Sequence, residues 1–195
     1  ADALLRQSAA MLLSSPGTIC LYQGEELGQN ETTLVYEELT DPPALRFWPE
    51  VKGRDGCRTP MVWDQGEPHA GFSDTTPWLP VKDDQAIRAV AHQQDQNDSV
   101  LAAYRAVLAF RKGSDALRFG TAAFLDLPEP VLAFLRDHDG QTLTAAFNLS
   151  HAPRTLTVGG DTALTGPSHA TLEGTRLQLP ANGFAWLTGS PTLSA

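Results

Sequence analysis

The chain has 195 residues, of which 42% are hydrophobic and 19% are charged, so it can bury a core in one domain or in two small ones. Its formal net charge of −9 argues against a nucleic-acid partner, because such binders present a basic face. No apolar stretch reaches the length of a membrane span, and residues 1–15 contain Asp2 and Arg6, so we expect neither a membrane partner nor a signal peptide.

The cysteine content predicts a reduced, cytoplasmic protein. Cys20 and Cys57 are too few for a disulfide-stabilised scaffold, and neither has the close Cys/His spacing of a zinc site. We expect two free thiols, with a bond between them as the alternative. We also expect no metal and no organic cofactor in this segment.

The first elements of the chain are a helix and a strand. Apolar residues recur at helical spacing over residues 2–15, and Pro16-Gly17 ends that helix. Residues 18–22 form an almost continuous apolar run, which is typical of a strand buried on both faces of a parallel sheet. Such a strand needs two parallel neighbours, and no second strand–helix unit follows it.

A long loop and a helix come next. Residues 23–85 are rich in Pro, Gly, Asp and Trp, and their aromatic content favours an ordered loop with short helical turns near 32–38 and 42–47. A helical stretch follows near residues 83–93. Ser99 and its two neighbours then offer an N-cap for a helix that ends at Gly113.

From about residue 117 the pattern changes to short β-segments with turn signals between them. Asp139-Gly140 joins residues 131–136 to residues 142–148, and this is the clearest hairpin signal in the chain. Glu173-Gly174 and Asn182-Gly183 separate further strands. The second half therefore predicts a small antiparallel β-domain, arranged as a β-sandwich.

The order helix, strand, elaborated loop, helix is what the end of a (β/α)8 barrel looks like. A whole barrel takes roughly 250 residues, so the first part of this chain cannot contain one. We expect the chain to be the C-terminal piece of a larger enzyme. Residues 1–113 would close the barrel, and residues 114–195 would form the C-terminal β-domain.

The most informative segment is Gly53–Asp64, which carries Arg54 and Arg58 among Gly, Asp, Thr and Pro. This composition predicts an ordered loop. Such a loop can aim two rigid guanidinium groups at a carboxylate or at sugar hydroxyls.

Together with its flanks, this segment resembles the α-glucosidase branch of glycoside hydrolase family 13, whose members include oligo-1,6-glucosidases. The matching segments, in the family's order, are residues 16–28, 53–64, 69–73 and 77–81. The resemblance covers nearly the whole chain and is most specific over residues 16–112. Val62 departs from it, since oligo-1,6-glucosidase-like members usually carry Gln there, which leaves the acceptor side open.

The resemblance implies a retaining, exo-acting α-glucosidase that hydrolyses or transglucosylates short α-glucosides. Arg58 matches the arginine that pairs with an aspartate at the floor of the −1 pocket, and Arg54 matches one nearer the +1 sugar. The catalytic carboxylates belong to motifs upstream of this chain, so we assign no catalytic residue and expect the segment alone to be inactive. Its partners are a small α-glucoside and the N-terminal part of the same enzyme, where the family's usual calcium site also lies.

Three other interpretations stay open. A sucrose or trehalose isomerase of the same family shares the arginine loop. A non-catalytic relative, such as the ectodomain of an amino-acid-transporter heavy chain, keeps the fold without the carboxylates. A free-standing carbohydrate-binding module is the third, although the β-segments show no aromatic row on one face.

Two smaller expectations concern the loop. Glu25 and Glu26 follow the predicted strand, and we expect them to open a helical turn and to bond to nearby loops. We expect Trp48, Trp63 and Trp78 to form a small core of the loop in preference to stacking on sugars.

Overall fold

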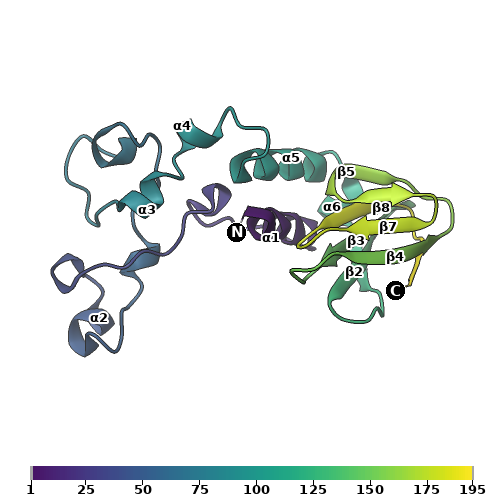
Figure 1. Cartoon of the computed structure of the whole chain (residues 1–195), viewed down its shortest axis with the longest axis horizontal. Helices are drawn as coiled ribbons and strands as arrows, with labels where there is room; N and C mark the ends of the chain where they lie inside the picture. The colour runs from purple at the N-terminus through teal and green to yellow at the C-terminus, as the bar shows by residue number, and fades with distance from the viewer. Residues whose placement is uncertain (1, 195) are drawn as a thin grey trace. The chain divides into compact units, whose positions relative to one another are not determined.

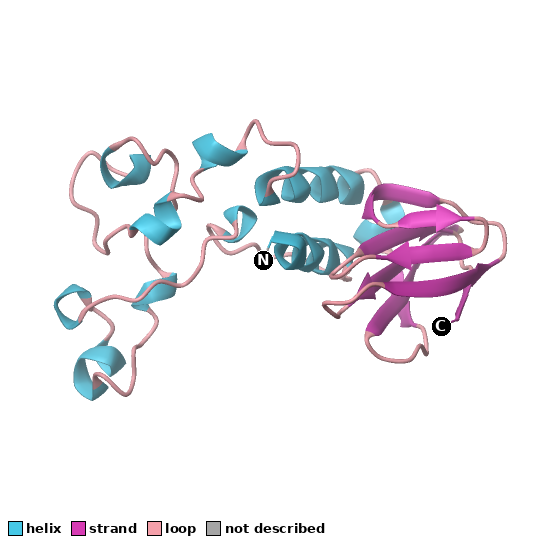
Figure 2. Ribbon diagram, in the orientation of Figure 1, coloured by secondary structure: helices cyan, strands magenta, loops and turns pink. Residues whose placement is uncertain are grey.

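The computed structural model describes residues 2–194, which divide into two units. The β-unit contains residues 2–20 and 103–194, and the loop unit contains residues 21–102. Figure 2 shows that the strands belong to the β-unit, whereas the loop unit consists of short helices and loops. None of the helices described is both long and apolar enough to cross a bilayer.

The β-unit is built on two antiparallel sheets, as the sequence predicts (Figure 1). One sheet has the strand order β1-β2-β3-β8-β5 and the other has the order β6-β7-β4-β9. The strands are β1 Thr121–Phe124, β2 Val131–His138, β3 Gln141–Asn148, β4 Arg154–Gly159, β5 Leu164–His169, β6 Thr171–Glu173, β7 Arg176–Leu179, β8 Phe184–Thr188 and β9 Thr192–Ser194. Buried aliphatic residues of both sheets form the core, among them Val131, Leu156, Leu177 and Leu187.

The predicted hairpin between β2 and β3 is confirmed. Asp139 and Gly140 both have positive φ angles, 47° and 84°, which is the backbone conformation of the tight turn that suits the twist of a hairpin. The register places Val131 opposite Asn148 at the far end of the pair.

Helix α1, Asp2–Ser14, packs on the five-stranded sheet through buried polar contacts. The side-chain amide of Gln7 donates to the carbonyls of Asn148 at 2.7 Å and of Gly183 at 3.0 Å. The indole N–H of Trp186 donates to the hydroxyl of Ser14 at 2.8 Å. These contacts explain why a helix at one end of the sequence belongs to the β-unit.

The C-terminal end of α1 is capped by two arginines from elsewhere in the β-unit. Arg111, on helix α5 (Val100–Lys112), donates to the carbonyl of Leu13 at 2.8 Å and to carbonyls of the turn that follows. Arg136 is fully buried and donates to the carbonyls of Ser14 and, at 2.7 Å, of Gly120. Burial lowers the pKa of both guanidinium groups from their ordinary value. The last carbonyls of a helix are negative, so two cations are well placed there.

The loop unit holds helices α2 Pro42–Phe47, α3 Asp83–Ala86 and α4 Val90–Gln93, with 3₁₀ turns at Glu25–Leu27, Tyr36–Glu38, Asp55–Cys57 and Pro68–Gly71. The predicted turns near 32–38 and 42–47 are confirmed. The N-cap of α5 is confirmed as well, because the Ser99 hydroxyl accepts from the backbone N–H of Ala102 at 3.1 Å. Helix α6, Asp115–Phe119, follows α5.

Three details differ from the sequence predictions. Residues 18–22 form no strand, because none of the described segments pairs with them, and Leu21 and Tyr22 are exposed. The helical stretch at 83–93 is broken, since the backbone N–H groups of Val90 and Ala91 bond to the carbonyls of residues 62 and 63. The core of the loop unit is aliphatic, and of the three tryptophans only Trp48 packs against it.

The predicted domain boundary between residues 113 and 114 stays a prediction.

Candidate substrate-binding site

The arginine loop, residues 53–58, folds tightly because two glycines let other backbone segments approach it. Gly53 has a φ of 71°, and a Cβ there would lie 2.7 Å from both Ala44 Cβ and Asp41 Oδ2. A Cβ on Gly56 would lie 2.2 Å from the carbonyl oxygen of Thr32. The loop therefore packs against α2 and against the backbone at Thr32 at distances that other residues do not allow.

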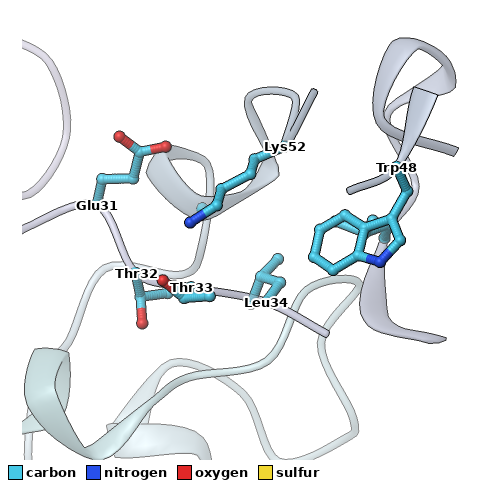
Figure 3. Close-up of a pocket in the computed structure, with 8 residues that line it drawn as sticks. Glu31, Thr32, Thr33, Leu34, Trp48 and Lys52 are labelled. Carbon is cyan, nitrogen blue, oxygen red and sulfur yellow. The ribbon is translucent and has the colours of Figure 1, made fainter. Parts of the chain in front are cut away.

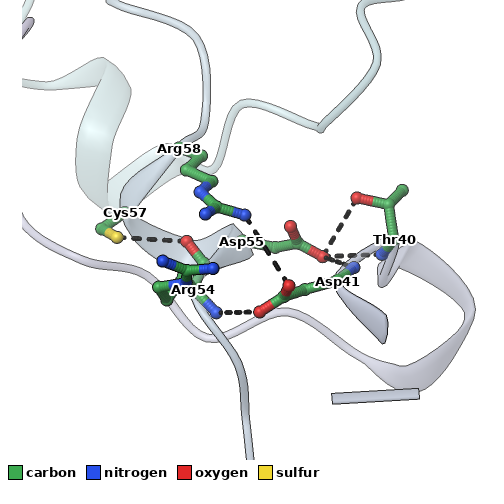
Figure 4. Close-up of polar contacts among 6 residues, drawn as sticks. All are labelled: Thr40, Asp41, Arg54, Asp55, Cys57 and Arg58. Atoms are coloured by element: carbon green, nitrogen blue, oxygen red, sulfur yellow. Dashed lines mark hydrogen bonds and ion pairs between the residues drawn. The ribbon is translucent and has the colours of Figure 1, made fainter. Parts of the chain in front are cut away.

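A buried carboxylate at Asp55 ties this loop to the turn before α2 (Figure 4). Its Oδ2 accepts from the backbone N–H groups of Thr40 at 2.6 Å and of Asp41 at 2.7 Å, and from the Thr40 hydroxyl at 3.2 Å. Burial alone would raise the pKa of Asp55. The hydrogen bonds from Thr40 and Asp41, with the charge of Arg58, outweigh burial and lower it below the ordinary value.

Asp41 then connects this turn to both arginines. Its Oδ2 accepts from the backbone N–H of Arg54 at 2.9 Å, and its Oδ1 lies 3.8 Å from Nη1 of Arg58. Asp41 is 5% exposed, while the Arg58 side chain is 40% exposed. The guanidinium of Arg58 is therefore anchored on one side by a buried carboxylate and open to solvent on the other. Within residues 2–194, the guanidinium of Arg54 has no hydrogen bond or ion pair.

The turn that follows residue 22 braces the other side of the arginine loop. The Tyr22 hydroxyl donates to the carbonyl of Cys57 at 3.0 Å, and the Gln23 amide donates to the carbonyl of Thr59 at 3.4 Å. Glu25 accepts from the backbone N–H of Tyr22 at 3.1 Å, at the start of the 3₁₀ turn. Glu25 thus opens a turn and bonds locally, as predicted. The buried Gln85 completes the support by donating to the Thr59 hydroxyl at 2.8 Å.

The structure brings together Arg54 and Arg58, which the sequence singles out, and adds two carboxylates that sequence reasoning missed. Asp41 and Asp55 lie in a loop without a periodic hydrophobic pattern, so the sequence does not indicate that their side chains are buried. The one local sign is that Asp41 directly precedes Pro42. The pairing of Arg58 with an aspartate at the floor of the −1 pocket stays a prediction. Cys20 and Cys57 are both free thiols, as expected. Among residues 2–194 no group of three or more His, Cys, Asp or Glu side chains could hold a metal ion.

The sequence of the chain is similar to a known family and to known α-glucosidases. The sequence profile of the α-amylase catalytic domain matches residues 2–120. A probable α-glucosidase of Rhizobium meliloti is 48% identical over 149 residues, and an oligo-1,6-glucosidase of Heyndrickxia coagulans is 32% identical over 161 residues. These alignments cover 76% and 73% of this chain, and 27% and 29% of the relatives.

Solved structures give the same picture of the fold. The crystal structure of the α-glucosyl transfer enzyme XgtA matches with a TM-score of 0.89 and 45% identity, covering 97% of this chain and 36% of XgtA. A variant of the trehalulose synthase MutB matches with a TM-score of 0.80 and 23% identity, covering 96% of this chain and 38% of that enzyme. The chain thus spans between about a quarter and two fifths of the length of these proteins.

Proposed function

The chain belongs to the α-amylase family, glycoside hydrolase family 13, and we propose that it is the C-terminal part of a retaining, exo-acting α-glucosidase. It carries the closing part of the family's (β/α)8 barrel, followed by the small antiparallel β-sandwich. The complete enzyme hydrolyses short α-glucosides or transfers their glucosyl unit to an acceptor sugar. The similarity to an α-glucosidase and to an α-glucosyl transfer enzyme supports both outcomes.

The observation that carries this proposal is the anchored pair of arginines. Arg58 rests against the buried Asp41, and Asp55 fixes the backbone that presents Asp41. A guanidinium that is held on one side presents its remaining N–H donors in a fixed direction, which suits the vicinal hydroxyls of a terminal glucose. Arg54, whose guanidinium has no partner within the described residues, contacts the neighbouring sugar.

The carboxylates of this site are unsuited to the covalent chemistry. A retaining glycosidase uses two carboxyl groups roughly 5–5.5 Å apart, one as the nucleophile and one as the general acid and base. Asp55 is 2% exposed and its Oδ2 already accepts three hydrogen bonds, so no substrate can reach that oxygen. We assign the nucleophile and the acid to the part of the enzyme that this chain does not span, and we assign positioning roles to Asp41 and Asp55.

The exposed apolar segment at residues 18–22 fits the same proposal. Its sequence is that of a doubly buried strand, yet Leu21 and Tyr22 face solvent. We infer that the N-terminal part of the same enzyme supplies the neighbouring strands and that the segment joins the sheet there.

The test is the kinetics of the complete enzyme after Arg58→Ala. Loss of the hydrogen bonds from a charged donor is worth about 1.5–3 kcal/mol, so kcat/KM for maltose and isomaltose should fall about 10- to 150-fold. Arg46→Ala is the matched control, because Arg46 is an arginine of the same unit that lies over the Phe47 ring and outside the loop. Near-wild-type kinetics of the Arg58 variant would remove it from the site. Conversion of sucrose to an isomeric disaccharide would identify an isomerase.

A further inference from the structure

A cavity of about 360 Å³ lies in the β-unit, at the corner where the chain passes from β5 of one sheet to β6 of the other. His169 and Ala170 form that corner, and the start of β4 and the end of β7 complete the lining. Pro153 and Pro180 flank the paired ends of these two strands and contribute rigid rings to the walls. We call it the Arg154 cavity. All the residues that line it belong to the β-unit, whereas the arginine loop belongs to the loop unit.

Three polar side chains form a row across the four-stranded sheet at this cavity. The register places Thr155 of β4 and Thr171 of β6 directly opposite Gln178 of β7, so the three side chains lie on one face of the sheet. The adjacent row contains Leu156 and Leu177, which belong to the core, so the polar row lies on the outer face. Within residues 2–194, none of these three polar side chains makes a hydrogen bond. Two hydroxyls and one amide are therefore available to a ligand.

The charge at the Arg154 cavity is positive, although the chain carries a formal net charge of −9. The lining contains Arg154 and no Asp or Glu, and the Arg154 guanidinium has no hydrogen bond or ion pair within the described part of the chain. Burial lowers the pKa of His169, and the positive charge of Arg6 on α1 lowers it further. A second cation thus acts at this corner. An anion bound here would meet both positive charges and the N–H donor of a neutral imidazole.

The cavity of the loop unit differs in its charge. It has a volume of about 220 Å³, and both Glu31 and Lys52 line it (Figure 3). One anion and one cation leave that lining without net charge, so it does not favour an anionic ligand. The Arg154 cavity favours one, and its volume falls within the roughly 300–1,000 Å³ of sites for small molecules.

A phosphate monoester of a small sugar matches these groups. A phosphate group carries about −1.5 to −2 charges at pH 7 and three acceptor oxygens, which a guanidinium binds through two parallel N–H donors. Inorganic phosphate alone would leave the polar row without a partner. Sugar hydroxyls both donate and accept, so they can bond to the threonine hydroxyls and to both ends of the Gln178 amide.

We propose that the Arg154 cavity binds a monosaccharide phosphate. The phosphate lies at Arg154 and His169, and the sugar hydroxyls lie at the row of Thr155, Gln178 and Thr171. This site goes beyond the proposed α-glucosidase activity and does not depend on it, because every residue that forms it belongs to the β-unit.

Isothermal titration calorimetry of the complete protein with glucose 6-phosphate tests the site. Arg154→Ala should weaken binding about 10- to 150-fold, because the charge-assisted hydrogen bonds to the phosphate are lost. Arg176→Ala is the matched control, since Arg176 is an exposed arginine of the same sheet outside the cavity, and it should bind like the wild-type protein. Inorganic phosphate should bind the wild-type protein more weakly than the sugar phosphate. No binding of glucose 6-phosphate, unchanged binding in Arg154→Ala, or equal affinity for inorganic phosphate would overturn the proposal.

Glucose 6-phosphate also contains a glucose ring, so a second variant separates this site from the arginine loop. Arg58→Ala should leave the affinity for glucose 6-phosphate unchanged. Binding that is lost in Arg58→Ala and retained in Arg154→Ala would mean that the ligand occupies the arginine loop, and this would overturn the proposal.

A second measurement reports on the cavity itself. In the complete protein labelled with ¹³C-histidine, the imidazole signal that disappears in His169→Gln should shift when glucose 6-phosphate is added. The signal of His138, a histidine of the same unit outside the cavity, should stay in place. An unchanged His169 signal would overturn the site even if the protein binds the ligand elsewhere.

Discussion

Replacement of Asp55 by Ala should loosen the turn that holds Asp41 and so release Arg58. The change removes the single oxygen that accepts from the backbone N–H groups of Thr40 and Asp41. A buried donor left without a partner costs about 1–3 kcal/mol. Thr40 is only half-buried, so water compensates part of its loss, and we expect about 2–3 kcal/mol in total.

Amide hydrogen exchange of the complete protein measures this loss directly. A change of 2–3 kcal/mol corresponds to about 30- to 150-fold faster exchange at Thr40 and Asp41. Asp55→Asn keeps one acceptor oxygen and should show a smaller effect. Asp64→Ala is the control, because the Asp64 carboxylate is an exposed side chain that accepts from Gly66. Unchanged exchange at both amides in the Asp55→Ala protein would refute the idea that this carboxylate holds the turn.

The same network has a defined pH dependence. The folded pKa of Asp55 is lowered, so its stabilising contribution is complete above the ordinary pKa of about 3.9 and is lost as the pH falls through the lower folded value. Titration of Asp55 should therefore not change the protection of the Thr40 and Asp41 amides against hydrogen exchange between pH 5 and pH 8.

Two further substitutions test the fold around the site. Arg136→Met, in the β-unit, leaves the buried carbonyls of Ser14 and Gly120 without their donor. We expect the free energy of unfolding of the β-domain, measured in urea, to fall by about 2–5 kcal/mol. An unchanged free energy of unfolding would show that Arg136 is dispensable. Gly56→Ala puts a Cβ 2.2 Å from the Thr32 carbonyl oxygen and should destabilise the loop by about 1–3 kcal/mol and lower kcat/KM, whereas Gly66→Ala, whose Cβ would meet only Asp64 Oδ1 at 3.4 Å, should be tolerated.

The sequence predicts well where a local signal is sufficient. Asp139-Gly140 supplies the positive φ angles that the hairpin needs, and Ser99 supplies the side-chain oxygen that caps α5. The arginine loop is also visible, because Arg54 and Arg58 stand out among turn-forming residues. These features depend on neighbours within a few positions along the chain.

The rest depends on partners that no local pattern reveals. Residues 18–22 have the composition of a buried strand, but a strand forms only where a neighbouring strand pairs with it. Arg136 lies two residues after Phe134 on the same face of β2, and helices cover that face, so the arginine is buried where a surface position would be expected. The burial of Asp41 and Asp55 likewise arises from contacts between loop segments about 14 residues apart.

The most direct test of the account is the anomeric configuration of the first sugar released. Proton NMR of the complete protein acting on maltose should show α-glucose from the non-reducing end before mutarotation, and Arg58→Ala should slow its release about 10- to 150-fold. Release of β-glucose, or the absence of any glucose from the wild-type protein, would contradict the assignment of this chain to a retaining α-glucosidase.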